Sequence, residues 1–540
     1  MRNNTVPGNA AHRFILLGAL LTLELVVVSV WLDTQSLDRQ TGLLGLIGDW
    51  GPEGLLTFVA SVAIVLTLAY ATSRGRFERC FEELSTPPVR WGVLTMHVVA
   101  LGVWIRLSRS LFAATSSGQS SNLAAAVWLA LGAAVVVLAA LALVPPRSWL
   151  KLAGATRTVW IYAAAIALAS RLLKNSFDAL WKPSSDLTFA LVKSSLHPFV
   201  PDLLADPVAF RIKSHAFSVV IAKECSGLEG AGLMLVFGAL WLWLQRHEYR
   251  FPRALLLIPI GVVVMWLTNI LRLDILFLIG HGGLRNVAAG GFHSQAGWIA
   301  FNAVAIGFSV ASRRARWLTK DGVEPPLADS YENPVTPYLL PLLAILAAGM
   351  VSRAVSGGFE WLYPLRFVVA AAVLWHFRSR YWDLDWRAGW LAPVAGIVVF
   401  GVWLALDRLA TIPDDGIVAG LASLPAPARL FWILFRTLAA VVTVPIAEEL
   451  AFRGYLLRRL ASSDFVSLSF KRVNLFAVLV SSAVFGVLHG DRVVAGSIAG
   501  VIYASTSMWR GRIGDAVVAH ATTNALIAAA VLLGGMWQLW

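Results

Sequence analysis

Long apolar runs separated by short polar segments dominate the chain. In the first 320 residues the runs cover residues 14–31, 55–71, 91–105, 123–144, 158–173, 231–244, 254–279 and 296–311. As helices, several of these runs are long enough to cross about 30 Å of hydrocarbon. The pattern predicts an all-α, polytopic transmembrane protein. No small-residue cleavage site follows the run 14–31, so we interpret it as a first span and not as a removed signal peptide.

A polar, proline-rich stretch interrupts this pattern between residues 320 and 336. Beyond it, apolar runs resume at residues 337–351, 366–376, 390–406, 429–447, 474–488, 495–508 and 515–534. Such a stretch is typical of a domain boundary. We therefore expect two membrane-embedded helical bundles, one in a domain of residues 1–320 and one in a domain of residues 337–540, joined by a linker at 321–336.

The positive charges fall in short clusters between the apolar runs. The chain carries 44 Lys and Arg against 31 Asp and Glu, yet 58% of its residues are hydrophobic. This favours a lipid bilayer over a nucleic acid as the partner, with the clusters acting as topology signals. With the N-terminus inside, the clusters at 74–79, 147–157, 246–253 and 313–316 lie in the cytoplasm, and residues 175–219 form an outer loop or amphipathic element. In the second half the alternation is less regular and leaves the sidedness open.

One cysteine stands where a polar, glycine-flanked segment becomes an apolar run. Cys225 lies in the sequence Ala-Lys-Glu-Cys-Ser-Gly-Leu-Glu-Gly at 222–230. A helix start and the nearby Lys223 both favour the thiolate, so this position suits a nucleophile. The alternative is a small buried apolar residue. The other cysteine, Cys80, lies in a basic loop on the opposite predicted face, which argues against a disulfide.

Two further polar residues lie at the outer ends of the spans that follow. Arg272 is a charge at membrane depth, which suggests function, and His293 opens the last run of this half. A thiolate can attack a peptide carbonyl while an imidazole moves protons and a guanidinium stabilises the oxyanion. The alternatives are that Arg272 pairs with Asp274 or Glu224 and that His293 caps its helix.

This ordered set resembles the exosortases, polytopic bacterial enzymes. The resemblance rests on Cys-Ser-Gly at 225–227, Asn-x-x-Arg at 269–272 and the downstream His293, and it covers about the first 320 residues. It implies Cys225 as nucleophile, Arg272 as transition-state stabiliser and His293 as acid and base, with a thioester intermediate. The implied substrates are membrane-anchored proteins with a C-terminal sorting signal, a transmembrane helix and a basic tail. Whether the acyl group passes to an acceptor or to water stays open.

A second polar set lies in the apolar runs of the second half. Spacings of four residues place its pairs on one helical face: Glu449 with Arg453, Phe485 with His489, and His520 with Asn524. Adjacent glutamates point about 100° apart on a helix, so we expect Glu449 to pair with Arg453 while Glu448 faces the site. A carboxylate and an imidazole can activate water, and a histidine with an asparagine can stabilise an oxyanion. The alternative is a set of helix-packing salt bridges and core histidines.

The three motifs Glu-Glu-x-x-x-Arg, Phe-x-x-x-His and His-x-x-x-Asn resemble the CAAX-processing and bacteriocin-processing intramembrane proteases, the CPBP or Abi family. The resemblance implies that Glu448 and His489 activate water and that His520 and Asn524 form the oxyanion site. Zinc held by Glu448, His489 and His520 is the competing mechanism, since these are acceptable zinc ligands. No His-Glu-x-x-His motif is present, and we favour an enzyme without metal or other cofactor.

Together the two halves resemble the exosortase E/protease fusions of the VPEID-CTERM system. The resemblance implies a multi-pass protein of the bacterial inner (plasma) membrane, with the Cys225 site toward the extracytoplasmic face. Our hypothesis is that the cysteine site handles the sorting signal and that the glutamate site cleaves the same substrate or another component. The alternatives are that only the glutamate site is catalytic, or that the chain is a non-catalytic assembly or immunity protein. A transporter is disfavoured because no inverted repeat is visible.

Overall fold

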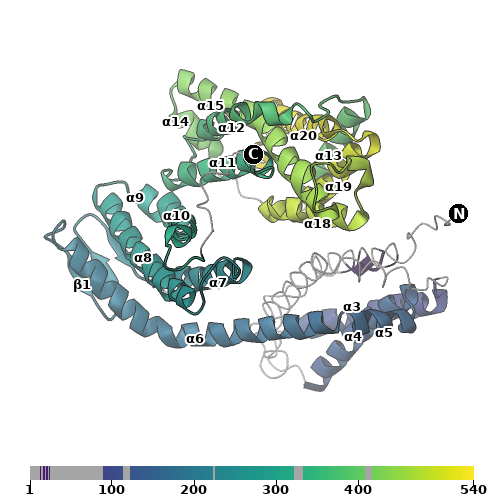
Figure 1. Cartoon of the computed structure of the whole chain (residues 1–540), viewed down its shortest axis with the longest axis horizontal. Helices are drawn as coiled ribbons and strands as arrows, with labels where there is room; N and C mark the ends of the chain where they lie inside the picture. The colour runs from purple at the N-terminus through teal and green to yellow at the C-terminus, as the bar shows by residue number, and fades with distance from the viewer. Residues whose placement is uncertain are drawn as a thin grey trace. The chain divides into compact units, whose positions relative to one another are not determined.

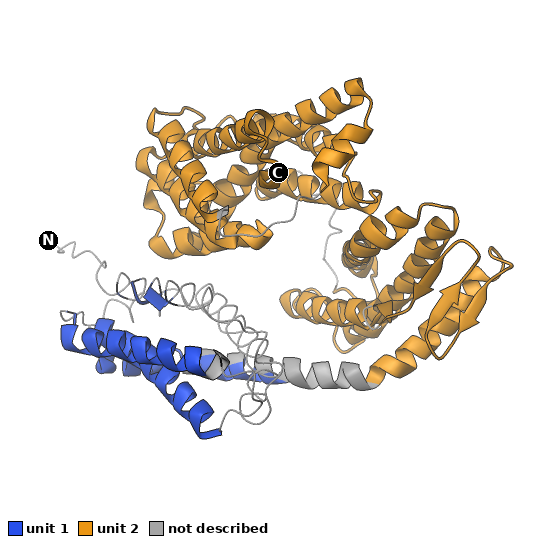
Figure 2. Ribbon diagram, turned by 180° about the vertical axis from the view of Figure 1, so that it is seen from behind, with its two compact units in different colours: residues 1–178 blue, residues 179–540 orange. Residues whose placement is uncertain are grey.

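The computed structural model describes residues 89–113, 122–222, 225–320, 333–407 and 416–540, together with isolated positions between residues 13 and 24. The chain divides into two compact units, Met1–Asp178 and Ala179–Trp540 (Figure 2). The predicted run 55–71, most of the run 14–31, Cys80 and residues 321–332 of the predicted linker lie outside the described residues. So do Lys223 and Glu224, which the sequence places beside Cys225 and among the alternative partners of Arg272. The domain boundary at 321–336 stays a prediction.

The described part of the first unit is a set of helices that pack through aromatic side chains. It comprises α3 (Trp91–Ala113), α4 (Asn122–Leu143), α5 (Pro146–Ala155) and the first part of α6 (Arg157–Leu196) (Figure 1). Trp104 of α3 stacks on Trp128 of α4 with ring centroids 5.5 Å apart. His97 is buried between the helices, with Nδ1 3.0 Å from the Val135 carbonyl oxygen and Nε2 2.7 Å from Glu24. Both ring nitrogens of this buried histidine are therefore paired.

Helix α6 differs from the element that the sequence predicts. The apolar run 158–173 and the polar segment after it form one helix of 40 residues, which ends at Leu196. The rest of that segment folds into a small antiparallel sheet of β1 (Leu204–Asp206), β2 (Arg211–Lys213) and β3 (Ser218–Val220), in the order β1-β2-β3. Ile212, the central residue of β2, is fully buried in a cluster with Val200 and Phe277. Burial of this one side chain anchors the sheet to helix α8.

The next helices surround the Cys225 segment. They are α7 (Leu228–Leu244), η3 (Arg253–Leu256), α8 (Leu257–His281), α9 (Arg285–Val287), the π-helical turn η4 (Ala288–Phe292) and α10 (His293–Arg314). Met234, Met265 and Phe308 form a common core between α7, α8 and α10. The hydroxyl of Tyr249 lies 2.7 Å from that of Ser312, which ties the segment after α7 to the end of α10.

The C-terminal part is a helical bundle. Its elements are α11 (Thr336–Ala354), α12 (Pro364–His376), η5 (Arg378–Tyr381), α13 (Leu391–Asp407), α14 (Ile417–Ser423), α15 (Ala426–Leu438), η6 (Ala439–Thr443), α16 (Val444–Glu449), η7 (Leu450–Leu457), α17 (Arg458–Ala461), η8 (Phe470–Arg472), α18 (Leu475–Val487), η9 (Gly490–Arg492), α19 (Val493–Arg510), α20 (Ile513–Gly534) and η10 (Trp537–Leu539). The predicted run 429–447 is part of a longer run of helix from Ala426 to Ala461. Two π-helical turns, η6 and η7, flank the two glutamates on α16.

Within the described residues, seven helices are long and apolar enough to cross a membrane. Shorter apolar helices of 10–17 residues, among them α7, α12 and α18, accompany them. The prediction of a polytopic, all-α membrane protein is therefore confirmed as a fold class. The three-residue strands near Cys225 are a local exception.

Candidate functional site

Cys225 lies in a tight turn just before α7. Its backbone N–H donates to the Ala222 carbonyl at 2.9 Å, and α7 begins at Leu228. Gly227 caps the helix with a φ of 85°, in the left-handed region that favours glycine. A Cβ atom at Gly227 would lie 2.7 Å from Cδ1 of Trp266. Glycine is therefore required at this position for the turn that carries Cys225.

Side chains from two neighbouring helices hold the carbonyl groups of this turn. Asn269 of α8 donates from Nδ2 to the Cys225 carbonyl at 2.9 Å. From α6, the hydroxyls of Ser184 and Thr188 both donate to the Ser226 carbonyl at 3.1 Å. Cys225 is only 2% exposed. The turn is thus fixed by α6 and α8, and the sequence analysis missed the contribution of α6.

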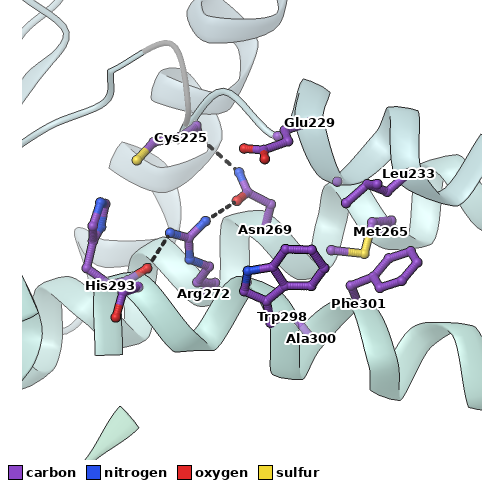
Figure 3. Close-up of a pocket in the computed structure, with 14 residues that line it drawn as sticks. Cys225, Glu229, Leu233, Met265, Asn269, Arg272, His293, Trp298, Ala300 and Phe301 are labelled. Atoms are coloured by element: carbon purple, nitrogen blue, oxygen red, sulfur yellow. Dashed lines mark hydrogen bonds between the residues drawn. The ribbon is translucent and has the colours of Figure 1, made fainter. Parts of the chain in front are cut away.

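Arg272 connects the cysteine turn to His293. Its Nη1 donates to Asn269 Oδ1 at 3.2 Å, and its Nη2 donates to the His293 carbonyl at 2.9 Å (Figure 3). Asp274 instead accepts a hydrogen bond from Ser195 at 2.9 Å. The structure therefore does not show the Arg272–Asp274 pair considered as an alternative, and it places the guanidinium between the cysteine turn and the start of α10.

Cys225, Arg272 and His293 line one pocket of about 200 Å³. Figure 3 shows the cysteine sulfur, the guanidinium and the imidazole at the same end of this pocket. The remaining lining includes Glu229 and Asn269, with apolar walls from Met265, Trp298 and Phe301. The structure thus brings together three residues that are far apart in the sequence. Their catalytic roles stay predictions.

In the C-terminal bundle, Glu449 is fully buried and binds two partners. Its Oε1 accepts a hydrogen bond from Arg453 Nη1 at 3.0 Å and another from His520 Nδ1 at 3.0 Å. Arg453, itself 1% exposed, also donates from Nη2 to the Gly500 carbonyl at 2.9 Å. Its guanidinium lies 4.5 Å from the centre of the Phe485 ring, within the range of a cation–π contact. The Glu449–Arg453 pair expected from the spacing of four is present.

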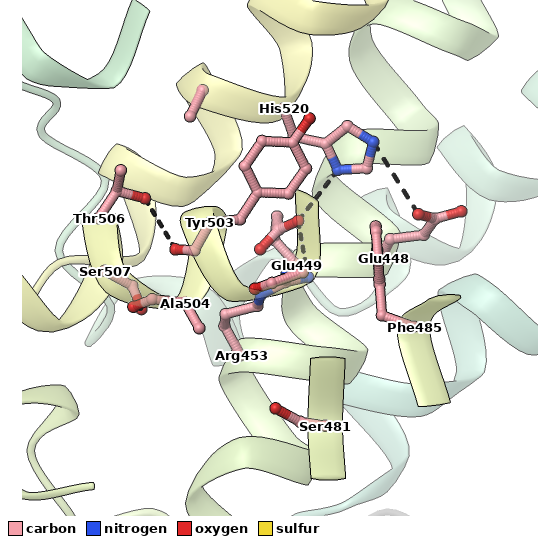
Figure 4. Close-up of polar contacts among 12 residues, drawn as sticks. Glu448, Glu449, Arg453, Ser481, Phe485, Tyr503, Ala504, Thr506, Ser507 and His520 are labelled. Carbon is pink, nitrogen blue, oxygen red and sulfur yellow. Dashed lines mark hydrogen bonds and ion pairs between the residues drawn. The ribbon is translucent and has the colours of Figure 1, made fainter. Parts of the chain in front are cut away.

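His520 lies between the two glutamates (Figure 4). Its Nε2 is 3.9 Å from Oε2 of Glu448, on the side of the ring opposite the Glu449 contact. Tyr503 stacks on the imidazole with centroids 4.9 Å apart and donates its hydroxyl to Thr523 at 2.8 Å. Oε2 of Glu448 is buried and has no hydrogen-bond partner among the described residues. This oxygen is thus available to a water molecule or a substrate.

His489 follows α18 and has a defined orientation. Its Nδ1 lies 2.8 Å from the Phe485 carbonyl oxygen, which can only accept, so Nδ1 carries the proton and Nε2 has the lone pair of the neutral ring. Helices α18 and α19 approach closely here, since a Cβ at Gly486 would clash with the Ser497 side chain. Small residues at such a contact allow tight helix packing in a membrane. The packing fixes the end of α18 that positions His489.

Asn524 is oriented by the π-helical turn η6. Its Nδ2 donates to the Ala440 carbonyl at 2.7 Å. A π-helical turn changes the backbone hydrogen-bond register and can leave a carbonyl for a side chain. An amide has two N–H donors, so one remains for a ligand.

Glu448, His489, His520 and Asn524 line one pocket of about 210 Å³, whereas Glu449 and Arg453 lie behind it. Other lining residues are Tyr363, Trp403, Arg436, Phe485, Tyr503 and Trp540. Sequence reasoning did not single out Tyr503 or Arg436, because no spacing links either residue to the motifs. A charge inside an apolar run was the available signal for Arg436.

The donor atoms at this pocket do not form a metal site in the arrangement seen. Within the described part of the chain, no group of three or more His, Cys, Asp or Glu side chains is placed to hold a metal ion. Glu448, His489 and His520, the ligands of the zinc alternative, are therefore not preorganised as a three-ligand set. The metal-free mechanism stays a prediction that chelation tests.

Comparison with known proteins concerns the C-terminal bundle. Residues 430–526 match a family model described as Type II CAAX prenyl endopeptidase Rce1-like. The match runs from α15 to α20 and includes all the predicted residues of the second site. This part of the chain is thus similar to membrane-embedded proteases. No curated protein and no solved structure matches the chain.

Proposed function

We propose that the chain is a multi-pass membrane endopeptidase that hydrolyses peptide bonds in the pocket of Glu448. The observation that carries the proposal is that a carboxylate oxygen without a hydrogen-bond partner among the described residues, two imidazoles and an amide line a single pocket. Polar groups at this depth are costly unless they have a function. The similarity of residues 430–526 to CAAX endopeptidases supports the same reaction class.

In the proposed reaction, Glu448 and Nε2 of His489 remove a proton from a water molecule as it attacks the peptide carbonyl. The proton then passes to the leaving amine as the carbon–nitrogen bond breaks. His520 and the remaining N–H of Asn524 donate hydrogen bonds to the oxyanion. The buried Glu449 carboxylate lies 3.0 Å from His520 Nδ1 and so fixes the ring with Nε2 on the side of Glu448.

The test uses a membrane-anchored substrate with a C-terminal sorting signal, co-expressed with the full chain. Glu448→Gln keeps the size of the side chain and removes the base. When it is introduced into a chain that already carries Cys225→Ala, we expect it to abolish the cleavage that remains. Glu248→Gln is the matched control, because Glu248 pairs with Arg313 outside both pockets. Full cleavage by the Glu448→Gln variant would contradict the proposal.

A second activity at the Cys225 pocket is favoured by the convergence of Cys225, Arg272 and His293. We propose an exosortase-like peptidase or transpeptidase at the extracytoplasmic face of the bacterial inner membrane. The thiolate attacks the peptide carbonyl, His293 protonates the leaving amine, and Arg272 stabilises the oxyanion. The thioester then passes its acyl group to an amine acceptor or to water. The substrates would be membrane-anchored proteins with a C-terminal sorting signal, as in the VPEID-CTERM system.

Single and double variants separate the two activities. We expect Cys225→Ala to leave the sorting signal uncleaved, and Glu448→Ala to prevent cleavage at a different peptide bond. Mass spectrometry of the substrate's C-terminal tail follows both cleavages. If only Glu448→Ala abolishes cleavage at the sorting signal, the chain is a glutamate-type protease alone. Maturation in each single variant but not in the double variant means that the sites are redundant. An uncleaved substrate with the wild-type chain favours the non-catalytic alternative.

A further inference from the structure

Direct contacts show which segments of the C-terminal bundle lie together at one end. Tyr338 at the start of α11 packs against Phe465, with ring centroids 5.4 Å apart. Tyr381 donates to the carbonyl of Pro337 at 2.7 Å. The pair of Arg512 and Asp385, 3.3 Å apart, connects the turn before α20 with the segment after α12. We call this the basic end, formed by the start of α11 and by residues 376–391, 458–474 and 510–513.

Another set of contacts defines the opposite end. Trp432 of α15 donates to the Glu360 carbonyl at 2.8 Å. Arg492 donates to the Gln538 carbonyl at 2.6 Å, and its guanidinium lies 5.7 Å from the centre of the Trp403 ring. The opposite end therefore comprises the α11–α12 segment, the start of α15, the α18–α19 turn and the C-terminal residues.

The two ends differ strongly in charge. At the basic end the cationic residues are Arg378, Arg380, Arg387, Arg458, Arg459, Lys471, Arg472, Arg510 and Arg512, against the acidic residues Asp383, Asp385 and Asp464. Among the described residues of the segments named for the opposite end, the charged ones are Arg353, Arg366, Arg429, Arg492, Glu360 and Asp491. There, Arg366 is paired with Glu360. An excess of Lys and Arg in short loops marks the cytoplasmic side of a membrane protein.

The connection from α10 supports the same orientation independently of these loops. Helix α10 ends at Arg314 within the cluster of Arg313, Arg314 and Arg316, which the sequence places in the cytoplasm. The stretch 321–332 that follows is polar, with two adjacent prolines and no apolar run. In the described residues, the turn before α10 packs against the end of α11, since a Cβ at Gly291 would clash with the Arg353 carbonyl, so the two helices run in opposite directions. The start of α11 is therefore on the cytoplasmic side, and α11 starts at the basic end.

The pocket of Glu448 belongs to the opposite end. Its outer lining comes from Tyr363 before α12, His489 after α18, and Leu539 and Trp540 at the C-terminus. None of the charged residues of the basic end lines it. We infer that this pocket opens toward the extracytoplasmic side and takes an extracytoplasmic segment of a membrane-anchored protein. The substrate class rests on the proposed function, whereas the orientation does not.

The orientation gives both pockets access to the same compartment. Helix α7 runs from the Cys225 turn toward the cationic cluster at Arg246, Arg250 and Arg253, so the same charge rule places the Cys225 pocket at the extracytoplasmic side. One exported, membrane-anchored protein can therefore present segments to both sites without crossing the membrane again. A peptide confined to the cytoplasm is excluded as a substrate of either pocket.

Cysteine labelling tests the orientation in the full chain. Cys80 and Cys225 are replaced by serine, and one cysteine is introduced at the exposed position Gln538→Cys at the opposite end or Ser463→Cys at the basic end. A membrane-impermeant maleimide is applied to intact spheroplasts and to permeabilised ones. We expect Gln538→Cys to react in both samples and Ser463→Cys only after permeabilisation. Ser423→Cys and Ala388→Cys, which are also exposed at these two ends, provide a second pair.

The reverse labelling pattern would overturn the inference, and so would equal labelling of both positions in intact spheroplasts. Because labelling needs no peptidase activity, its result is independent of the proposed function. The expected labelling in a chain that cleaves no peptide would contradict the proposed function and leave the orientation standing. Cleavage of a cytoplasmic peptide combined with the reverse labelling would contradict the orientation and leave the peptidase activity standing.

Discussion

Oε1 of Glu449 lies 3.0 Å from Nδ1 of His520, and the same oxygen lies 3.0 Å from Nη1 of Arg453. One buried carboxylate oxygen thus fixes both an arginine and an imidazole. Glu448, the preceding residue, lies in the pocket, and its Oε2 has no hydrogen-bond partner among the described residues. The environments of the two adjacent glutamates therefore favour different tasks: Glu449 positions other side chains, and Glu448 is placed to take part in the reaction.

The first prediction contrasts the two glutamates. We expect Glu449→Gln to destabilise the protein by about 3–5 kcal/mol, because removing one partner of a buried ion pair leaves the other charge uncompensated. We expect Glu448→Gln to lower cleavage by a factor on the order of 10² or more while leaving stability nearly unchanged. Thermal unfolding in detergent and peptide cleavage, measured on the same preparations, check both effects. Equal destabilisation by the two variants would show that the division of tasks is wrong.

The second prediction concerns the contact between α18 and α19. A Cβ at Gly486 would meet the Ser497 side chain and the Val493 carbonyl, so we expect Gly486→Ala to destabilise the bundle by about 1–3 kcal/mol and to displace His489. Gly401→Ala on α13 is the matched control, since no atom lies within 4 Å of its added Cβ. At that position alanine should stabilise the helix by up to about 1 kcal/mol. Unfolding midpoints of the two variants should shift in opposite directions.

The sequence allowed prediction of the bundle and of the residues in each pocket for simple physical reasons. A membrane requires long apolar helices, so the spans are visible as runs. The spacing of four between Glu449 and Arg453 places both on one helical face, and the structure shows the pair. The charged and polar residues inside apolar runs, such as Arg272 and His520, stand out because they are costly there.

Other features depend on contacts that have no local pattern. Helix α6 continues through a polar segment that includes Pro183, and Ser184 and Thr188 reach the Ser226 carbonyl only in the folded chain. Strands of three residues are too short for a period of two to be recognised. The stacking of Tyr503 on His520 joins α19 and α20, and no pattern in the sequence of either helix indicates it. The inferred sidedness of the second bundle depends on contacts that sort its loops into two ends, and no single run of the sequence shows these contacts.

The third prediction concerns Asn269 as a positioning residue for Cys225. Asn269 is 5% exposed and bonds both the Cys225 carbonyl and Arg272. We expect Asn269→Ala to slow Cys225-dependent cleavage by roughly 10- to 100-fold, on the scale of a lost positioning contact. It should also change the pH profile of Cys225 alkylation. A structural role alone would lower the unfolding midpoint without altering that profile.

The control for this variant is Thr268→Ala. Thr268 is half-buried, and its hydroxyl donates to the Val264 carbonyl of its own helix at 2.8 Å. We expect alkylation and cleavage to match the wild type. An equal effect of both substitutions would point to a general disturbance of α8 and contradict the specific role of Asn269.

The fourth prediction is that metal removal leaves cleavage at the Glu448 pocket unchanged. His489 and His520 each use Nδ1 for a protein contact, and within the described residues Glu448, His489 and His520 are not placed together as a three-ligand set. Treatment of the purified full chain with a strong zinc chelator should therefore keep the cleavage rate within about twofold, whereas His489→Ala should abolish it. Loss of activity on chelation, restored by zinc alone, would favour a metal bound by Glu448, His489 and His520. In that case Nε2 of each histidine would coordinate the ion while Nδ1 keeps its present contact, the usual arrangement for a metal-bound imidazole, and the binding of zinc itself should be measurable by calorimetry.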